Sequence, residues 1–305
     1  MKILGIDIGG TRLKAGLVDD AGQLSCMTCT RTPATLAEFR EEMKRIGCLP
    51  SVGGVGIGCK GIINPETTRV DVLPGTLHFL EGLLLSDLVG GSAPVRADND
   101  ARAALAGEVA WGAARGRRNA VMLTLGTGVG GGILADGRLL RGSTGVAGHL
   151  GHLTVDPDGP VCICGNRGCL ETIFSARAIE AEAISAVIRG CHSSLTDEFS
   201  ADPRKVTCEA VFAAAAKGDE IGQAICDRAV RYLAGAIAGI FGALDPEVVI
   251  LGGQIAEAGA VLFGPLQQQV TERARRLVGH DVPLVRAQVT EPGIVGAAAL
   301  VKFGS

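Results

Sequence analysis

Residues 120–140 read AVMLTLGTGVGGGILADGRLL, and this stretch decides the fold. Two apolar runs flank a glycine-rich turn, and an Asp136-Gly137 turn leads to a third short run, so the pattern predicts strand, turn, strand, hairpin and strand. The beginning of the chain repeats this pattern, because residues 2–18, KILGIDIGGTRLKAGLV, also place a Gly-Thr turn between two apolar runs. The repetition predicts two related α/β halves that face each other.

The two glycine-rich turns are candidate phosphate-binding sites. Glycine lacks a Cβ, so backbone N–H groups can approach an anion, and the hydroxyl groups of Thr11 and Thr127 add donors. Asp7, at the end of the first strand, could hold Mg²⁺ directly or through water. The second turn is neither a Walker loop, since no Lys-Ser/Thr follows, nor a Rossmann fingerprint, since a strand follows. An ordinary hairpin explains the first turn alone equally well, whereas five glycines among residues 125–132 would weaken a strand pair and suggest that a ligand needs the space. Together the two turns could clamp a nucleotide's phosphates.

An acidic cluster, Asp98-Asn99-Asp100, precedes an alanine-rich run and predicts a helix over residues 101–113. Asp100 is a candidate general base that takes a proton from an attacking hydroxyl group. An aspartate here more commonly caps the helix, but Asp98 or Asn99 could cap it instead and release Asp100 for catalysis. Gly252-Gly253 follows an apolar strand over residues 247–251 and is either a plain turn or a place where a flat ring lies against backbone.

Residues 148–171, GHLGHLTVDPDGPVCICGNRGCLE, predict a metal site. Zn²⁺ prefers four tetrahedral nitrogen and sulfur ligands, which His152, Cys162, Cys164 and Cys169 could supply. The glycines between the cysteines permit the tight turns that point several sulfurs inward. The alternative is three buried cysteines without a metal, because free cysteine behaves as a small hydrophobic residue.

Composition limits the class of protein. The chain has 305 residues, enough for two domains, and its aromatic content of 3% implies a core of aliphatic side chains. The net charge is −3 and no basic stripe is visible, which argues against nucleic acid as a partner. Ten cysteines without a framework spacing indicate reduced thiols and a cytoplasmic location. The longest apolar run, residues 233–244, is too short to span a membrane and predicts a buried helix.

The motifs occur together and in order in one family, and the chain resembles the ROK sugar kinases. The resemblance covers nearly the whole chain; it rests on DIGGTRLKAGLV (7–18), VGIGCKG (55–61), NDARAALAGE (99–108), LGTGVGGGIL (125–134), GHLTV with CICGNRGCLE (151–171), VVILGG (248–253) and GIVGAAAL (293–300). The Cys-x-Cys-Gly-x-x-Gly-Cys-x-Glu element is highly specific to the family, whereas the glycine-rich hairpins are shared more widely.

The resemblance implies an α/β architecture, namely a two-lobed actin-like ATPase (ribonuclease H-like) fold with a deep interdomain cleft and a structural zinc loop. It implies a smaller α/β domain over residues 1–115, with a C-terminal helix (292–305) packing back on it. A larger α/β domain over residues 116–291 would carry the zinc loop. The family often dimerises, so a homodimer is expected, with neither nucleic acid nor membrane as a partner.

The activity implied is ATP-dependent phosphorylation of a hexose hydroxyl, the 6-OH of glucose or of a related sugar, with ATP, Mg²⁺ and structural Zn²⁺. Asp100 would be the general base. The residues implied to bind the sugar are Asn99, Asp100, His149, His152, Glu171, Gly61 and Thr76. Those implied to bind ATP and Mg²⁺ are Asp7, Gly9, Gly10, Thr11, Lys14, Gly126, Thr127, Gly128, Gly252 and Gly253. Zinc would be bound by His152, Cys162, Cys164 and Cys169.

Three residues depart from the family pattern, all on the acceptor side. His149 stands where Glu is usual, Lys60 where Pro is usual, and Thr76 where Asn is frequent. The acceptor therefore stays open, with N-acetylhexosamines (GlcNAc or ManNAc), fructose and allose as alternatives to glucose, and the preferred phosphoryl donor is open as well. A different class is a sugar-sensing transcriptional regulator of the same family. It would need a separate DNA-binding partner, because the sequence begins directly at the first strand.

Overall fold

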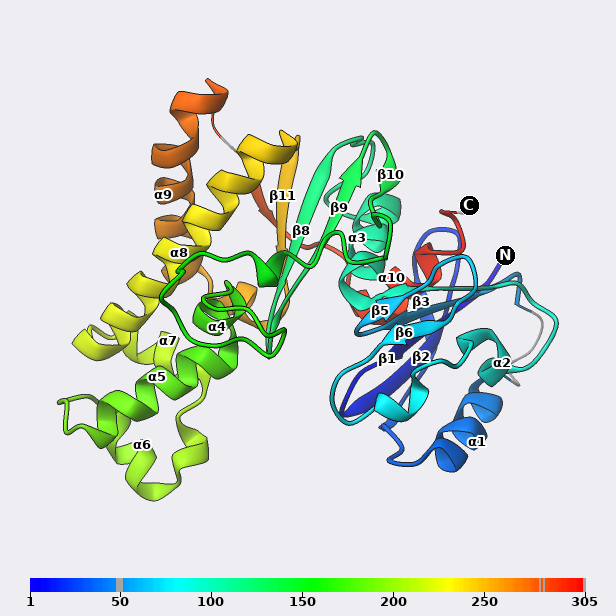
Figure 1. Cartoon of the computed structure of the whole chain (residues 1–305), viewed down its shortest axis with the longest axis horizontal. Helices are drawn as coiled ribbons and strands as arrows, with labels where there is room; N and C mark the ends of the chain where they lie inside the picture. Colours follow the sequence, from blue (N-terminus) through cyan, green and yellow to red (C-terminus); the bar gives the residue numbers. More distant parts are fainter. Residues whose placement is uncertain (48–51, 280, 282, 304–305) are drawn as a thin grey trace. The chain divides into compact units, whose positions relative to one another are not determined.

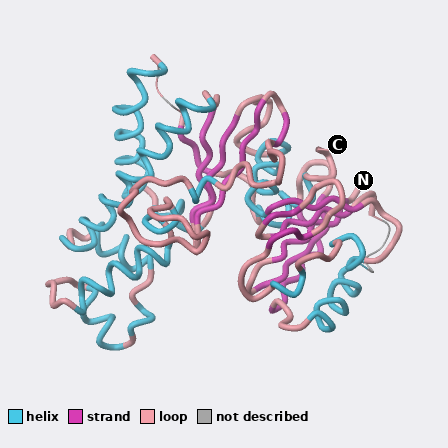
Figure 2. Tube along the Cα trace, viewed as in Figure 1, coloured by secondary structure: helices cyan, strands magenta, loops and turns pink. Residues whose placement is uncertain are grey.

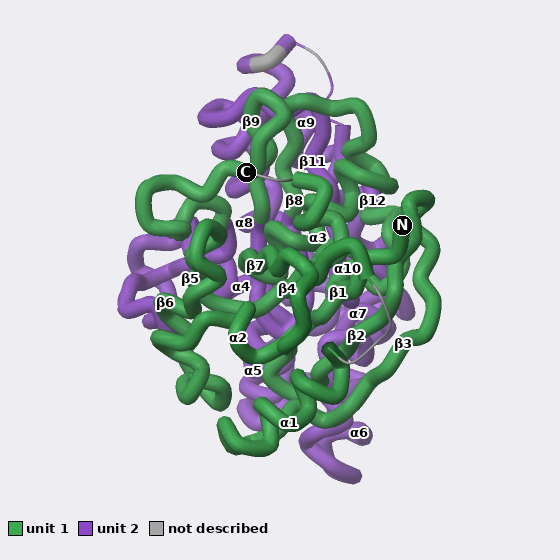
Figure 3. The backbone as a smooth tube through the Cα atoms, turned by 90° about the vertical axis from the view of Figure 1, so that its right-hand side faces the viewer, with its two compact units in different colours: residues 1–122, 132–148, 287–305 green, residues 123–131, 149–286 purple. Residues whose placement is uncertain are grey.

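A computed structural model describes residues 1–47, 52–279, 281 and 283–303 (Figure 1). The chain divides into two compact units, coloured separately in Figure 3. Unit 1 comprises Met1–Met122, Gly132–Gly148 and Ala287–Ser305, and unit 2 comprises Leu123–Gly131 and His149–Arg286. These bounds differ from the expected division into 1–115 and 116–291, because residues 116–122, 132–148 and 287–291 belong to unit 1.

The first sheet has the strand order β3-β2-β1-β4-β7. Its strands are β1 (Ile3–Ile8), β2 (Arg12–Val18), β3 (Leu24–Arg31), β4 (Val55–Cys59) and β7 (Val95–Asn99). Strand β1 pairs antiparallel with β2 and parallel with β4, which pairs parallel with β7. The register aligns Asp7 with Gly58 and Gly58 with Asp98. The turns that follow β1, β4 and β7 therefore lie at one edge of the sheet, where ligands commonly bind in open α/β folds.

The second sheet repeats this order as β10-β9-β8-β11-β12. Its strands are β8 (Ala120–Leu125), β9 (Val129–Ala135), β10 (Arg138–Leu139), β11 (Val248–Gly252) and β12 (Leu284–Arg286). The repeated sequence pattern thus corresponds to two sheets with the same strand order, and the α/β class is confirmed. Strands β5 (Ile62–Ile63) and β6 (Val70–Val72) form a separate antiparallel pair.

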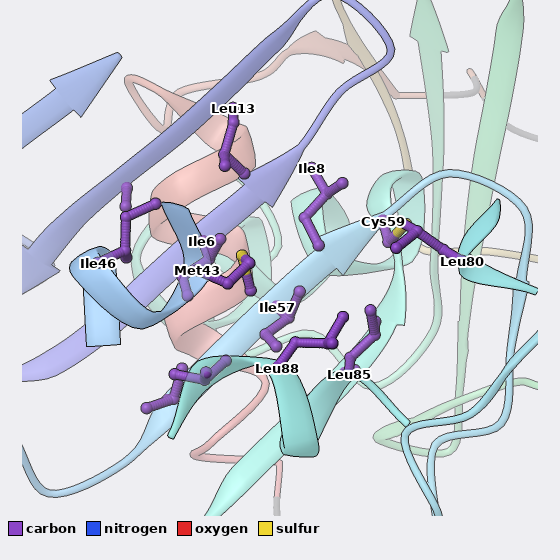
Figure 4. Packing of buried hydrophobic residues seen from close by; sticks show 14 of the residues in the cluster. Ile6, Ile8, Leu13, Met43, Ile46, Ile57, Cys59, Leu80, Leu85 and Leu88 are labelled. Carbon is purple, nitrogen blue, oxygen red and sulfur yellow. The ribbon is translucent and has the colours of Figure 1, made fainter. Parts of the chain in front are cut away.

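Helix α1 (Leu36–Gly47) covers one face of the first sheet. The expected helical spacing over residues 36–46 is confirmed, since Phe39, Met43 and Ile46 are buried. Figure 4 shows Met43 beside Ile6 and Ile57 of the sheet. The 3-10 helix η1 (His78–Leu80) and helix α2 (Leu85–Val89) add further buried leucines to the same cluster. This packing makes the first sheet a firm base for the turns at its edge.

Helices α3 (Asp100–Trp111) and α10 (Pro292–Ala299) pack against each other, and α10 also lies on β1 and β4. Small residues allow this close approach, because a Cβ on Gly107 would lie 3.0 Å from the Cα atom of Gly296. Residues 304 and 305 of the expected C-terminal helix lie outside the described part of the chain. Strand β9 explains the altered unit boundary, since Gly132 packs against Leu105 of α3.

Unit 2 contains most of the helices of the described residues. Figure 2 shows all helices of the chain in cyan. The helices of unit 2 are η2 (Leu150–His152), α4 (Glu171–Phe174), α5 (Ala176–Ile188), α6 (Leu195–Ala201), η3 (Pro203–Lys205), α7 (Cys208–Ala216), α8 (Glu220–Leu244), η4 (Gln254–Ala258) and α9 (Ala260–Val278). The apolar run 233–244 forms the end of α8, which packs against α9 and α7. Within the described residues, no helix combines the length and hydrophobicity needed to cross a membrane.

Candidate active site

Asn99 links the end of β7 to the start of α3. Its Oδ1 atom accepts hydrogen bonds from the backbone N–H groups of Ala101 (3.0 Å) and Arg102 (3.3 Å), so Asn99 is the N-cap of α3. Its Nδ2 atom donates to the carbonyl oxygen of Gly61 at 3.1 Å. One amide hydrogen of Asn99 is therefore left for a ligand. The helix begins at Asp100, one residue earlier than expected, and the side chain of Asp100 is exposed.

Asp7 lies near Asp100, and its pKa is raised above the ordinary value. Burial and, after it, the nearby charges of Asp100 and Glu291 together raise the pKa of Asp7 to about 6, while Lys14 opposes the shift. Lys14 donates to Glu291 Oε2 at 2.8 Å, and this contact raises the pKa of Lys14. A buried carboxyl group beside a second carboxyl group favours a nearby cation, so Asp7 suits the expected Mg²⁺ role.

The turn after β1 faces two groups from other loops. Gly10 and Thr11 line a cavity of about 1000 Å³ together with Thr76. A Cβ on Gly10 would lie 3.7 Å from Lys60 Nζ and 3.8 Å from Thr76 Oγ1. Lys60 Nζ donates to the carbonyl oxygen of Pro74 at 3.2 Å. Two of the three residues that depart from the family pattern therefore lie beside the first phosphate-binding candidate.

In unit 2, Glu171 fixes the turn between β8 and β9. Its Oε2 atom accepts a hydrogen bond from the backbone N–H of Val129 at 2.9 Å, and its carboxyl group packs against Gly128. The carbonyl oxygen of Gly126 accepts from the backbone N–H of Ala176 at 2.9 Å, at the start of α5. Thr127, at the tip of the turn, is exposed. The turn is thus held on both sides while its tip stays accessible to a ligand.

The turn Gly252-Gly253 lies against the end of β8. Gly253 has a φ of 87°, and a Cβ there would run into the backbone of Leu125. A cavity of about 500 Å³ adjoins both turns, with Gly126 on one side and Gln254 on another. Further lining residues come from α5, α7, η4 and α9; among them are Ala176, Glu180, Cys208, Phe212, Ala213 and Val261. The structure therefore brings together the two turns of unit 2 that were expected to serve the nucleotide, beside a cavity with apolar and acidic walls.

The expected zinc ligands also come together in unit 2. One ligand atom each from His152, Cys162, Cys164 and Cys169 lies within 4.8 Å of the others. His152 Nδ1 is 3.5 Å from Cys162 Sγ, and Cys164 Sγ is 3.6 Å from Cys169 Sγ. A tetrahedral zinc ion with Zn–S bonds of about 2.3 Å places its ligand atoms about 3.7 Å apart, so this donor set fits zinc.

Local contacts change the protonation of the cluster's thiols. Burial raises the pKa of Cys169 to about 12, whereas the backbone N–H of Asn166 lowers the pKa of Cys164.

His149 lies outside the cluster, but its ring runs nearly parallel to that of His152, with an angle of 13° between the ring planes and 6.3 Å between the ring centroids. A metal would therefore fix the ring of His152, against which the ring of His149 lies.

Four charged residues of unit 1 were not expected from the sequence to contribute. Asp98, considered only as a possible cap, is fully buried and accepts from Arg102 and Arg141. A signal was present, since residues 98 and 102 are an acid and a base four positions apart, and Arg102 interrupts an alanine-rich helix. Lys60 had been noted only as a departure, and nothing in the sequence places it beside Gly10.

The chain matches the family model described as the ROK family over residues 3–303. A glucokinase from Thermotoga maritima is 38% identical, over 99% of this chain and 98% of its own length. An N-acetylmannosamine kinase from Citrobacter koseri is 36% identical over 99% of each chain. The crystal structure of a ROK family glucokinase from Streptomyces griseus in complex with glucose and AMPPNP is similar over 100% of both chains, with 29% identity and a TM-score of 0.85.

Proposed function

Because this chain belongs to the ROK family, we propose that it is a sugar kinase that transfers a phosphoryl group from ATP to a hydroxyl of a hexose, the 6-OH of glucose or of a related sugar. The observation that carries the proposal is the start of α3. Asn99 caps the helix, which leaves the exposed carboxylate of Asp100 beside Asp7 at the ligand-binding edge of the sheet.

In the proposed mechanism Asp100 accepts the proton of the attacking sugar hydroxyl as its oxygen bonds to the γ-phosphorus. The bond between the γ-phosphorus and the β–γ bridging oxygen breaks, and ADP leaves with that oxygen. Asn99 would orient the sugar through its remaining amide hydrogen. In each unit the glycine-rich turn, Gly10-Thr11 in unit 1 and Gly126-Thr127 in unit 2, carries N–H and hydroxyl groups that could donate hydrogen bonds to phosphate oxygens. Mg²⁺, held near Asp7, would neutralise charge on the phosphates.

The cavity beside Gly126 and Gln254 is the proposed site of the nucleotide base. Phe212, Ala213 and Val261 supply apolar contact, and small residues leave room for a flat ring. Glu180 is already an acceptor for the backbone N–H of Cys208 at 3.0 Å, so it stiffens the cavity wall. This arrangement supports ATP as the donor.

The remaining finer predictions are supported to different extents. A two-lobed actin-like fold is supported by the two sheets of equal strand order. A structural zinc ion is supported by the four converging ligand atoms, which leave no position for a substrate. Such an ion would order residues 152–169 and the adjoining Glu171. The homodimer and the cytoplasmic location stay predictions from the sequence.

The function is tested by coupled ATP consumption with a panel of glucose, GlcNAc, ManNAc, mannose, fructose and allose. We expect turnover with at least one hexose and a sugar phosphate as product by mass spectrometry. Absence of turnover with every sugar, in zinc- and magnesium-replete protein, would contradict the kinase assignment. It would then favour the sugar-sensing regulator of the same family, whose sugar binding would be detected by calorimetry.

His149 is expected to set the preference for the sugar. A glutamate only accepts hydrogen bonds, whereas neutral histidine offers one donor and one acceptor, so His149 favours a sugar that presents an acceptor, such as an acetamido oxygen. His149→Glu should shift the ratio of kcat/KM between glucose and the N-acetylated sugars toward glucose by about tenfold or more. The sugar panel measures this ratio directly.

The matched control is His192→Glu, the same exchange at an exposed residue of unit 2. It should leave the order of sugars unchanged. Zinc content is measured in both variants, because the ring of His149 lies against that of His152. If His149→Glu and the parent protein rank the sugars identically, with similar kcat/KM, His149 does not determine specificity.

A further inference from the structure

Helix α3 and the residue before its cap hold all the fully buried charged side chains among the residues described. These are Asp98, Arg102 and Glu108, and each residue exposes 0% of its surface to solvent. Burying charge is costly, and replacing a buried ion pair by apolar residues often leaves stability unchanged or raises it. The contacts of each buried charge therefore decide whether it serves stability or the placement of other residues.

Arg102 binds a segment that has no regular structure of its own. Its Nη1 atom donates to the carbonyl oxygens of Gly145 (2.9 Å) and Ala147 (2.6 Å). Residues 141–148 contain neither helix nor strand, and three glycines in this segment have positive φ angles. Because no ladder of backbone hydrogen bonds defines such a segment, its path depends on the side chains that hold it.

Asp98 completes the network from the end of β7. Its Oδ1 atom accepts from Arg102 Nε at 2.7 Å and from the backbone N–H of Asn99 at 2.8 Å. Its Oδ2 atom accepts from Arg141 Nε at 2.8 Å, so the same carboxylate also holds the beginning of the segment. Asp98 thus fixes the guanidinium group of Arg102 and the backbone of the sugar-binding candidate Asn99 together.

The network retains an imperfection that a purely stabilising cluster would avoid. Arg102 Nη2 is buried and has no hydrogen-bond partner within the described part of the chain. An unpaired buried donor costs free energy, so this nitrogen does not hold the guanidinium group in place. The contacts to Asp98, Gly145 and Ala147 determine its position instead. A guanidinium has the fork geometry needed to meet a carboxylate and two carbonyl groups at once.

We infer that Arg102, locked by Asp98, is a positioning residue for the sugar: it ties the segment 141–148, which leads directly into His149, to the start of α3, which carries Asn99 and Asp100. The inference rests on the proposed function, since these residues are its sugar-binding and catalytic candidates. Arg102 acts through other residues and touches no substrate. A misplacement of about 1 Å at such a site can lower the rate by about 10²-fold, so loss of this tie should be visible in kinetics.

The test compares variants of two buried charges on the same helix. Arg102→Lys keeps the positive charge but cannot meet three acceptors in the same geometry. It is expected to raise the KM for the sugar by about tenfold or more while leaving the KM for ATP within about twofold. Arg141→Gln removes the partly exposed contact to Asp98 and should have a smaller effect in the same direction.

Glu108→Gln is the matched control. Glu108 is equally buried, but its carboxylate accepts from the backbone N–H groups of Ala113, Gln288 and Val289, away from the segment 141–148. It should lower Tm without raising the KM for the sugar. If Glu108→Gln raises that KM as much as Arg102→Lys does, the effect follows from stability alone and the inference is overturned.

Hydrogen exchange separates this inference from the proposed function. Amides of residues 143–148 should exchange faster in Arg102→Lys and Arg141→Gln than in Glu108→Gln, whether or not a sugar is turned over. Unchanged exchange, or an active parent whose sugar KM is insensitive to both arginine variants, overturns the positioning role. If the parent protein phosphorylates none of the sugars, the kinase assignment is contradicted. The proposed role of Arg102 in positioning the sugar is then contradicted as well. Arg141→Gln keeps the test decisive if Arg102→Lys does not fold, because Arg141 is 32% exposed.

Discussion

Asp100→Asn is expected to lower kcat by about 10²–10⁴-fold, the usual contribution of a general base, while the dissociation constant for the sugar changes little. The amide preserves the shape of the side chain but cannot take up the proton of the attacking hydroxyl. Coupled-assay kinetics give kcat, and calorimetry with the preferred sugar gives the dissociation constant. The separation of the two quantities is the expected signature of a group that acts in the transition state.

Because of the capping geometry, this experiment separates an effect on catalysis from an effect on stability. Asn99 caps α3, and an asparagine at position 100 keeps the Oδ1 atom that accepts from the backbone N–H of Ala101 at 2.8 Å. Asp100→Asn therefore leaves the cap intact and removes the favourable charge in the first turn, worth about 0.3–1 kcal/mol. Unfolding would therefore not explain a loss of turnover. Asp87→Asn is the matched control, because Asp87 is the acid in the first turn of α2 in the same unit. A variant of Asp100 that keeps most of its kcat would remove this residue from the mechanism.

Local patterns in the sequence were sufficient to predict the elements that carry the site. Apolar alternation around glycine turns predicted the hairpins, and the helical spacing of Phe39, Met43 and Ile46 predicted α1. The Asp-Asn-Asp cluster predicted the start of α3 to within one residue. These features succeed because each depends on neighbours within a few positions, where side-chain period and capping chemistry dominate.

Contacts between distant residues were beyond such reasoning. Lys60 meets Gly10 and Pro74 only because β4 lies beside β1, and the cavity at Gly126 receives walls from α7 and α9. The two compact units differ from the expected domains at residues 116–122, 132–148 and 287–291, and periodicity does not reveal that β9 packs on α3. Arg102 was not singled out from the sequence, and its contacts to the carbonyl oxygens of Gly145 and Ala147 depend on the path of residues 141–148.

Loss of one zinc ligand is expected to have the largest effect on stability. Structural zinc contributes about 10–16 kcal/mol of apparent binding free energy in small zinc-finger peptides, so its loss here should lower Tm by many degrees. Cys169→Ser should reduce the zinc content from one ion per chain to none by metal analysis. Cys226→Ser is the matched control, because Cys226 is buried in α8, outside the cluster, and its variant should keep the zinc.

The pH dependence of zinc binding tests the same prediction independently. Zinc binds thiolates, and burial raises the pKa of Cys169 to about 12, so metal binding must release that proton. Protons and zinc therefore compete, and affinity for zinc should rise with pH and fall on acidification, whereas an ion held by carboxylates alone would be insensitive near neutrality. Chelator titrations between about pH 6 and 8 measure this slope. Zinc retained in Cys169→Ser, or zinc absent from protein purified with zinc present, would show that the cluster is three packed thiols and a histidine, and that residues 152–169 are ordered by packing alone.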